Sequence, residues 1–168
     1  PCALDEIIDS SGALCSQAFQ KSRVTLRKKF SARPLPILGS PEHLSRVFLN
    51  LMSNAVQAMP QGGSLSIETR LEIGLGGRPQ AQVTVEDTGV GLSQEALRKL
   101  FKPFGTTRPT QGGTGLGLYL CREIAAKHGG FLRAENRPEG GARFILSIPL
   151  QDLRPASATS SVKELACH

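Results

Sequence analysis

Residues 40–59 constrain the fold most, because they predict one long helix with two different faces. Ser40 is a good N-cap and Pro41 suits the first helical position. Apolar residues recur at helical spacing and predict a core stripe: Leu44, Val47, Phe48, Leu51, Met52, Ala55 and Met59. Three amides, Asn50, Asn54 and Gln57, fall within about 60° of one another at the edge of that stripe. Because asparagine is a mediocre helix former, these amides either cap neighbouring backbone or hold a ligand.

The remaining patterns predict further helices and strands on both sides of this helix. Helices are expected over residues 3–21, 94–100 and 115–128, and strands over 24–30, 37–38, 64–73, 81–87, 131–135 and 142–149. The first helix has apolar positions at Leu4, Ile7, Ile8, Leu14, Ala18 and Phe19, and the strand at 64–73 has Leu65, Ile67, Thr69 and Leu71 on one face. Strands separated by few helices predict an α+β fold, a two-layer α/β sandwich with a mixed, mainly antiparallel sheet and helices on one face.

Length and composition indicate one domain over residues 1–150 and a flexible tail over 151–168, which is Ser/Ala-rich and lacks periodicity. The net charge is +6, but the basic residues are scattered and only Arg27–Lys29 forms a triplet, so nucleic-acid binding is not favoured.

We find no signal peptide and no apolar run of about 20 residues, so we expect a soluble chain. Because the chain begins at Pro1, we expect a fragment of a longer protein.

The four cysteines are Cys2, Cys15, Cys121 and Cys167. They lie far apart and form no C-x-x-C motif, which argues against zinc and for a reducing compartment. Cys15 and Cys121 fall in helical patterns and are most simply small core residues.

Asp87 ends the strand in which Val83 and Val85 mark the buried face, and it continues their phase, so its carboxylate should point inward. A buried carboxylate is costly unless it is hydrogen-bonded, and a nearby backbone N–H is the ordinary partner. Gly89 and Gly91 follow, and their missing side chains would let a flat ligand approach the backbone. A carboxylate that accepts from an exocyclic amine would recognise adenine.

A second cluster is the glycine-rich run at 112–118, where a helix is expected to begin at once. A helix N-terminus binds anions, although a glycine run can also be a plain flexible hinge. The run matches neither the Rossmann nor the Walker pattern. Just upstream, Thr106, Thr107 and Arg108 offer hydroxyls and a guanidinium to a phosphate, or form an ordinary polar loop. With asparagine oxygens available to Mg²⁺, the whole set indicates a Mg-nucleotide site.

These segments resemble the four motifs of the GHKL superfamily, most closely the ATP-binding domain of bacterial sensor histidine kinases. The motifs stand in order: Asn50–Ala55 resembles the N-box, Asp87–Gly91 the G1 box, Phe101–Phe104 the F-box with its Thr-Thr-Arg lid, and Gly113–Leu118 the G2 box. The resemblance runs from about Asp5 to Leu150, and the segment after Asn54 is similar to nitrogen-regulator-type kinases. Two departures are Gly105, where the lid often has phenylalanine, and Ser40, where an aspartate is common.

The resemblance implies the GHKL (Bergerat) fold, with ATP and Mg²⁺ as cofactors. Asn54 would ligate Mg²⁺, Asp87 would bind the adenine amine, and the run 113–118 would cradle phosphates. The implied catalytic residues are Asn50, Asn54 and Arg108. The implied nucleotide-binding residues are Asn50, Asn54, Gln57, Asp87, Gly89, Gly91, Phe104, Thr106, Thr107, Arg108, Gly113, Thr114, Gly115, Leu116, Gly117 and Leu118.

By the same resemblance, the chain donates the γ-phosphate of ATP to a histidine on a helical-hairpin domain of the same kinase, which is dimeric when complete. A response regulator would be the next partner. No contact with nucleic acid or membrane is expected from this cytoplasmic segment, although the parent kinase can be membrane-anchored.

We expect structural or incidental roles for His43, for His168 and for His128, which lies at a helix C-terminus where a cation is favoured.

Three alternatives stay open. GHKL hydrolases have a glutamate one turn before the Mg-binding asparagine, whereas this chain has Asn50, an amide that cannot act as a general base. Anti-sigma-type serine kinases share the motifs, but the segment after Asn54 resembles them less. A nucleotide-binding or protein-interaction module without catalysis is the third alternative, because Gly105 removes an apolar residue from the lid.

Overall fold

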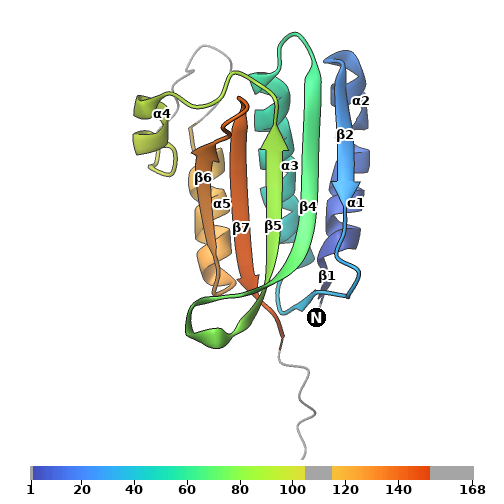
Figure 1. The fold of residues 1–168 in the computed structure, drawn as a ribbon, viewed down its shortest axis with the longest axis vertical. Coiled ribbons are helices and arrows are strands. Elements are labelled where there is room, and N and C mark those ends of the chain that lie inside the picture. Colours follow the sequence, from blue (N-terminus) through green and yellow to red (C-terminus); the bar gives the residue numbers. More distant parts are fainter. Residues whose placement is uncertain (1, 105–114, 152–168) are drawn as a thin grey trace, which may run out of the picture.

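The computed structural model describes residues 2–104 and 115–151, and these ranges contain five α-helices and seven β-strands (Figure 1). The helices are α1 (Leu4–Leu14), α2 (Ser16–Lys21), α3 (Pro41–Ala58), α4 (Gln94–Lys99) and α5 (Gly117–Lys127). The strands are β1 (Cys2–Ala3), β2 (Val24–Lys29), β3 (Pro36–Ile37), β4 (Gly63–Ile73), β5 (Pro79–Asp87), β6 (Phe131–Asn136) and β7 (Ala142–Pro149). A short 3-10 helix, η1 (Leu75–Gly77), joins β4 to β5.

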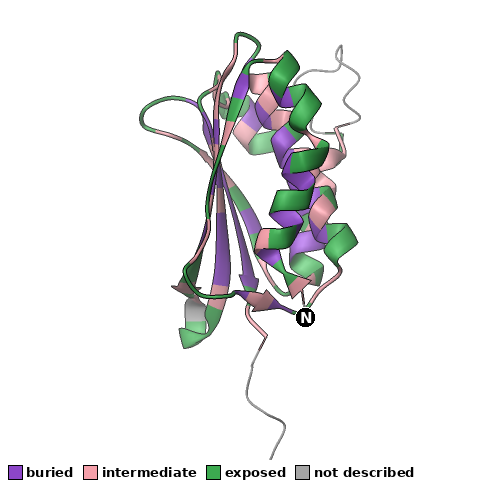
Figure 2. Cartoon of the chain, turned by 90° about the vertical axis from the view of Figure 1, so that its right-hand side faces the viewer, coloured by how far each residue is buried: buried purple, intermediate pink, exposed green. Residues whose placement is uncertain are grey.

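The main sheet has five strands in the order β2-β4-β5-β7-β6. Only the β2–β4 pair is parallel, and the other three pairs are antiparallel. The long helices lie on one face of this sheet, and no helix of the described residues covers the other face (Figures 1 and 2). The predicted fold class, a mixed and mainly antiparallel sheet with helices on one face, is therefore confirmed.

Helix α3 is the centre of the core, as its apolar stripe predicts. Its buried side chains are Leu44, Val47, Phe48, Leu51, Met52 and Ala55. Ser40 caps the helix, because its Oγ accepts a hydrogen bond from His43 N at 3.3 Å. Met59 lies one residue beyond the helix but remains buried. The buried side chains of β4, β5 and β7 pack against this helix and complete the core. The half-buried Asn50 and Asn54 therefore lie at the rim of the apolar layer.

The single helix predicted over residues 3–21 is wrong, because the chain turns at Cys15 between α1 and α2. The interruption ends the helical phase that would place Leu14 and Ala18 on the same face as Phe19. Leu14 is accordingly 72% exposed and Ala18 is exposed, whereas Phe19 is buried. Leu71 is predicted on the buried face of its strand but is 40% exposed. It lies near the end of β4, where the residues next to the β4–β5 turn are no longer buried.

His128 joins the end of α5 to the start of α3. Its Nδ1 lies 2.8 Å from Ile124 O, and its Nε2 accepts a hydrogen bond from Ser40 N at 3.2 Å. The two contacts agree with a structural role for His128.

Cys121 is the most deeply buried of the described cysteines, and burial raises the pKa of its thiol to about 12. At pH 8 only about one such thiol in ten thousand is ionised, and the thiolate is the reactive form. We expect Cys121 to stay unmodified by iodoacetamide in the native protein at pH 8 and to react fully in guanidinium chloride. Peptide mass mapping measures both states, and fast alkylation of native Cys121 would contradict its burial.

Among the residues that the structure describes, no helix is both long and apolar enough to span a lipid bilayer.

Candidate functional site

Three segments that are distant in sequence meet at one end of the sheet, the upper end in Figure 1. The loop after β5 lies against the C-terminal end of α3, because Val90 N donates to Ala58 O at 3.1 Å. The first turn of α5 lies against the middle of α3, where a methyl group placed on Gly117 would come within 2.3 Å of Asn50 Oδ1. The structure thus brings together the predicted N-box, G1-box and G2-box residues that it describes.

Asp87 points inward, as the strand phase predicts, and is only 3% exposed. Its Oδ1 accepts hydrogen bonds from Gly89 N at 2.8 Å and Ala142 N at 3.2 Å. The ordinary explanation of a buried carboxylate, a backbone N–H partner, therefore accounts for one oxygen. Oδ2 has no hydrogen bond to any described residue, so it can accept one from a ligand.

Gly89 and Gly91 keep the loop close to its neighbours. A methyl group on Gly89 would lie 2.4 Å from Ala58 O, so only glycine allows the loop to pack on α3 at this point. Gly91 has φ +73, a left-handed conformation that favours glycine. The absence of side chains, expected to admit a flat ligand, is required first for the packing of the loop itself.

The three amides of α3 differ in their surroundings. Asn50 and Asn54 are half-buried, and Gln57 is exposed. Among the described residues, the side-chain amides of Asn50 and Asn54 have no hydrogen-bond partner, so the alternative that they cap neighbouring backbone is not realised there. Two half-buried amides without such partners are available to a ligand at the rim of the core.

The first turn of α5 contains the described part of the glycine-rich run. Gly115 has φ +68, Gly117 is the first residue of the helix, and Leu116 and Leu118 are half-buried beside them. Leu116, the N-cap residue of α5, makes no side-chain cap hydrogen bond, and the first N–H groups of a helix attract anions. Phe104 is 74% exposed. Five predicted site residues lie outside the described residues: Thr106, Thr107, Arg108, Gly113 and Thr114.

The turn between β6 and β7 also belongs to this site, although the sequence indicates only a turn. Arg137 Nη1 donates to the main-chain oxygen of Asp87 at 3.0 Å. The side-chain amide of Asn136 bonds both Leu92 N and Leu92 O at 2.8 Å. No local signal identifies these residues, because their contacts depend on the pairing of β5, β6 and β7.

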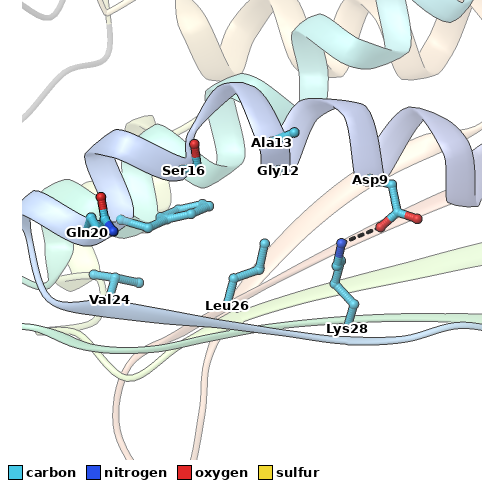
Figure 3. A pocket seen from close by; sticks show the side chains of 9 residues that line it. Asp9, Gly12, Ala13, Ser16, Gln20, Val24, Leu26 and Lys28 are labelled. Carbon is cyan, nitrogen blue, oxygen red and sulfur yellow. Dashed lines mark hydrogen bonds and ion pairs between the residues drawn. The ribbon is translucent and has the colours of Figure 1, made fainter.

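The cavity in Figure 3 lies elsewhere, between the two N-terminal helices and the edge strand β2. Its volume is about 530 Å³, and Phe19, Val24 and Leu26 are among its apolar lining residues. An ion pair between Asp9 and Lys28 lies at its side. None of the predicted site residues lines this cavity, so it is distinct from the cluster around Asp87.

Comparison with known families and proteins finds a consistent set of similarities. The family described as "Histidine kinase-, DNA gyrase B-, and HSP90-like ATPase" matches residues 39–152. Sporulation kinase C of Bacillus subtilis (strain 168) is 33% identical over 149 residues, which are 88% of this chain and 33% of that protein. The sensor histidine kinase ZraS of Klebsiella oxytoca is 36% identical over 149 residues, 88% of this chain and 30% of that protein. The chain thus spans about a third of the length of these relatives.

Solved structures agree with the fold. The nucleotide-free catalytic domain of the histidine kinase ThkA has a TM-score of 0.76 and 30% identity, covering 89% of this chain and 93% of that one. The mycobacterial sensor histidine kinase MprB has a TM-score of 0.73 and 25% identity, covering 89% of this chain and 96% of that one.

Proposed function

The chain belongs to the histidine kinase-, DNA gyrase B- and HSP90-like ATPase family, and on this premise we propose that it is the catalytic domain of a sensor histidine kinase. The domain binds Mg-ATP and donates the γ-phosphate to a histidine on a helical-hairpin domain of the same kinase. The observation that carries the proposal is the buried Asp87, whose Oδ2 lacks a partner among the described residues, together with two half-buried amides of α3 whose side chains also lack one.

In this proposal Asp87 recognises the base. Its Oδ2 accepts a hydrogen bond from the exocyclic amine of adenine, while Oδ1 stays bonded to Gly89 N and Ala142 N. The two backbone bonds fix the carboxylate before the nucleotide arrives, so little ordering remains to be done on binding. Gly91 and Leu92 continue the wall of the base pocket.

The phosphates lie at the edge of the contact between α3 and the first turn of α5. The N–H groups at the start of α5 bind phosphate oxygens, and Thr106, Thr107, Arg108, Gly113 and Thr114 complete the cradle. Asn54 provides a neutral amide oxygen, a ligand type that suits Mg²⁺ when phosphate oxygens supply most of the remaining coordination. Bound Mg²⁺ neutralises charge on the phosphates during transfer. Gln57, one turn beyond Asn54, lines the phosphate side.

Asn50 favours phosphotransfer over hydrolysis. It lies one turn before Asn54, the position from which a glutamate activates water in the hydrolases of the superfamily. An amide cannot remove a proton from water, so Asn50 only helps to shape the site beside Gly117. In our proposal the acceptor is a histidine positioned by another domain, and a response regulator in the cytoplasm receives the phosphoryl group next.

Radiolabelled ATP tests this proposal directly. The domain is mixed with [γ-³²P]ATP, Mg²⁺ and the helical-hairpin domain of the same kinase, with a matched hairpin variant whose acceptor histidine is glutamine. We expect label on the unaltered hairpin only, stable in alkali and lost in acid, as phosphohistidine is. Acid-stable label would indicate a serine kinase, and release of free phosphate without transfer would indicate a hydrolase; either result contradicts the proposal.

A further inference from the structure

We propose that Arg137 is a positioning residue for nucleotide recognition, because it fixes the backbone of Asp87 from the turn between β6 and β7. The proposal rests on the assignment of Asp87 as the adenine acceptor. Arg137 itself need not touch the nucleotide. It holds the carbonyl of Asp87 in place and thereby determines where Oδ2 lies.

Arg137 bonds Asp87 on the side of β5 where the ladder with β7 has ended, whereas on the other side Asp87 still pairs with Leu65 of β4. The β5–β7 ladder ends at the pair Glu86 and Arg143, one residue before Asp87. Arg137 Nη1 donates to Asp87 O at 3.0 Å and to Gly140 O at 3.2 Å, while its main-chain N–H donates to Gly141 O at 3.0 Å. One guanidinium therefore ties the last residue of β5 to the turn.

Its ion pair with Glu86 does not by itself explain why the Arg137 side chain is buried. Its side chain is only 17% exposed, and Nε is buried without a hydrogen-bond partner among the described residues, 3.6 Å from Glu86 Oε2. Glu86 already has a closer partner in Arg143, which also bonds Glu135 at 3.0 Å. A buried N–H without a hydrogen bond costs free energy. A second ion pair, from Nη2 to Glu139 Oε2 at 3.8 Å, involves a carboxylate that is 70% exposed. Unlike Arg143, Arg137 donates hydrogen bonds to main-chain oxygens, those of Asp87 and Gly140.

Other residues in and beside the turn also contact Asp87 and Leu92. Gly141 has φ +87, and a methyl group there would lie 2.0 Å from Asp87 O. Ala142 N donates to Asp87 Oδ1, and the side chain of Asn136 holds Leu92 at the far end of the loop. Both ends of the segment 87–92 are therefore held by this turn and by the strand residues Asn136 and Ala142 on either side of it. Since a hydrogen bond to adenine weakens steeply with small errors of distance and angle, release of the turn should impair recognition of the amine.

The test compares Arg137→Met with the matched control Arg143→Met. Both variants remove an arginine from Glu86, but only Arg137 contacts Asp87. Calorimetry gives the Kd of ATP and of purine riboside triphosphate, which lacks the exocyclic amine. We expect Arg137→Met to lower the preference for ATP about tenfold, the size of one hydrogen bond to a charged group. Arg143→Met should keep the wild-type preference.

Further variants separate the possible failures. If Asp87→Asn leaves the preference unchanged, the assignment of Asp87 fails and this inference falls with it. If Asp87→Asn abolishes the preference but Arg137→Met keeps it, or weakens both nucleotides equally, Arg137 has only a structural role and the inference alone is overturned. Should Arg137→Met fail to fold, Arg137→Lys retains a donor and the charge; we expect about a threefold loss of preference, and an unchanged value would overturn the inference.

Discussion

Replacement of Asp87 by asparagine is expected to weaken ATP binding about a hundredfold and to leave the fold intact. Asparagine has nearly the same shape, and its Oδ1 can still accept from Gly89 N and Ala142 N. Its Nδ2 would then face the exocyclic amine, so two donors would meet where a donor now meets a carboxylate. Loss of a hydrogen bond to a charged group, with a buried donor left unpaired, costs about 3 kcal/mol, which corresponds to about a hundredfold in Kd. Calorimetric titration with ATP measures the effect.

Glu135→Gln is the matched control for this variant, because it removes one negative charge from the outer face of the sheet without a contact to Asp87. It should bind ATP like the wild type, and both variants should keep melting temperatures within a few degrees of it. Wild-type ATP affinity in Asp87→Asn would remove the proposed base contact. A collapse of its melting temperature would assign the carboxylate to stability instead.

Replacement of Gly89 by alanine is expected to abolish detectable ATP binding and to destabilise the domain by about 1–3 kcal/mol, the usual cost of an overpacked site. The new methyl group would lie 2.4 Å from Ala58 O and 2.8 Å from its carbonyl carbon, which are backbone atoms that cannot rotate away. The loop must therefore lift from α3, and Gly89 N leaves Asp87 Oδ1. Urea unfolding and ATP titration measure the two effects.

Gly74→Ala is the control for this substitution. Its methyl group would come within 2.7 Å of Gln80 Oε1, the movable end of a side chain at the start of β5. Gly74→Ala should keep ATP binding and lose little stability. If Gly89→Ala behaved in the same way, the contact between the loop and α3 would not be required for the site.

The sequence predicts the features of this domain that depend on local periodicity. The apolar stripe of α3, its cap at Ser40 and the inward phase of Asp87 follow from spacing and cap chemistry alone. Local periodicity fails where the chain interrupts it. Cys15 ends one helix and begins another, which no pattern within residues 3–21 indicates, and Leu14 is exposed as a result.

Contacts between distant segments account for the rest. Arg137 and Asp87 are 50 residues apart, and only the pairing of β5, β6 and β7 brings them together. The explanation of Gly89 also changes in the structure, since the residue faces the Ala58 carbonyl. The sequence leaves open whether Asn50 and Asn54 cap backbone or hold a ligand, and their lack of partners among the described residues favours the ligand.

A crystal structure of the domain with Mg²⁺ and a non-hydrolysable ATP analogue tests the central claim most directly. We predict adenine with its exocyclic amine within hydrogen-bond distance of Asp87 Oδ2, phosphates at the first turn of α5, and Mg²⁺ bound by the side-chain oxygen of Asn54. A nucleotide bound with its base away from Asp87, for example in the cavity beside α1 and β2, would contradict the account.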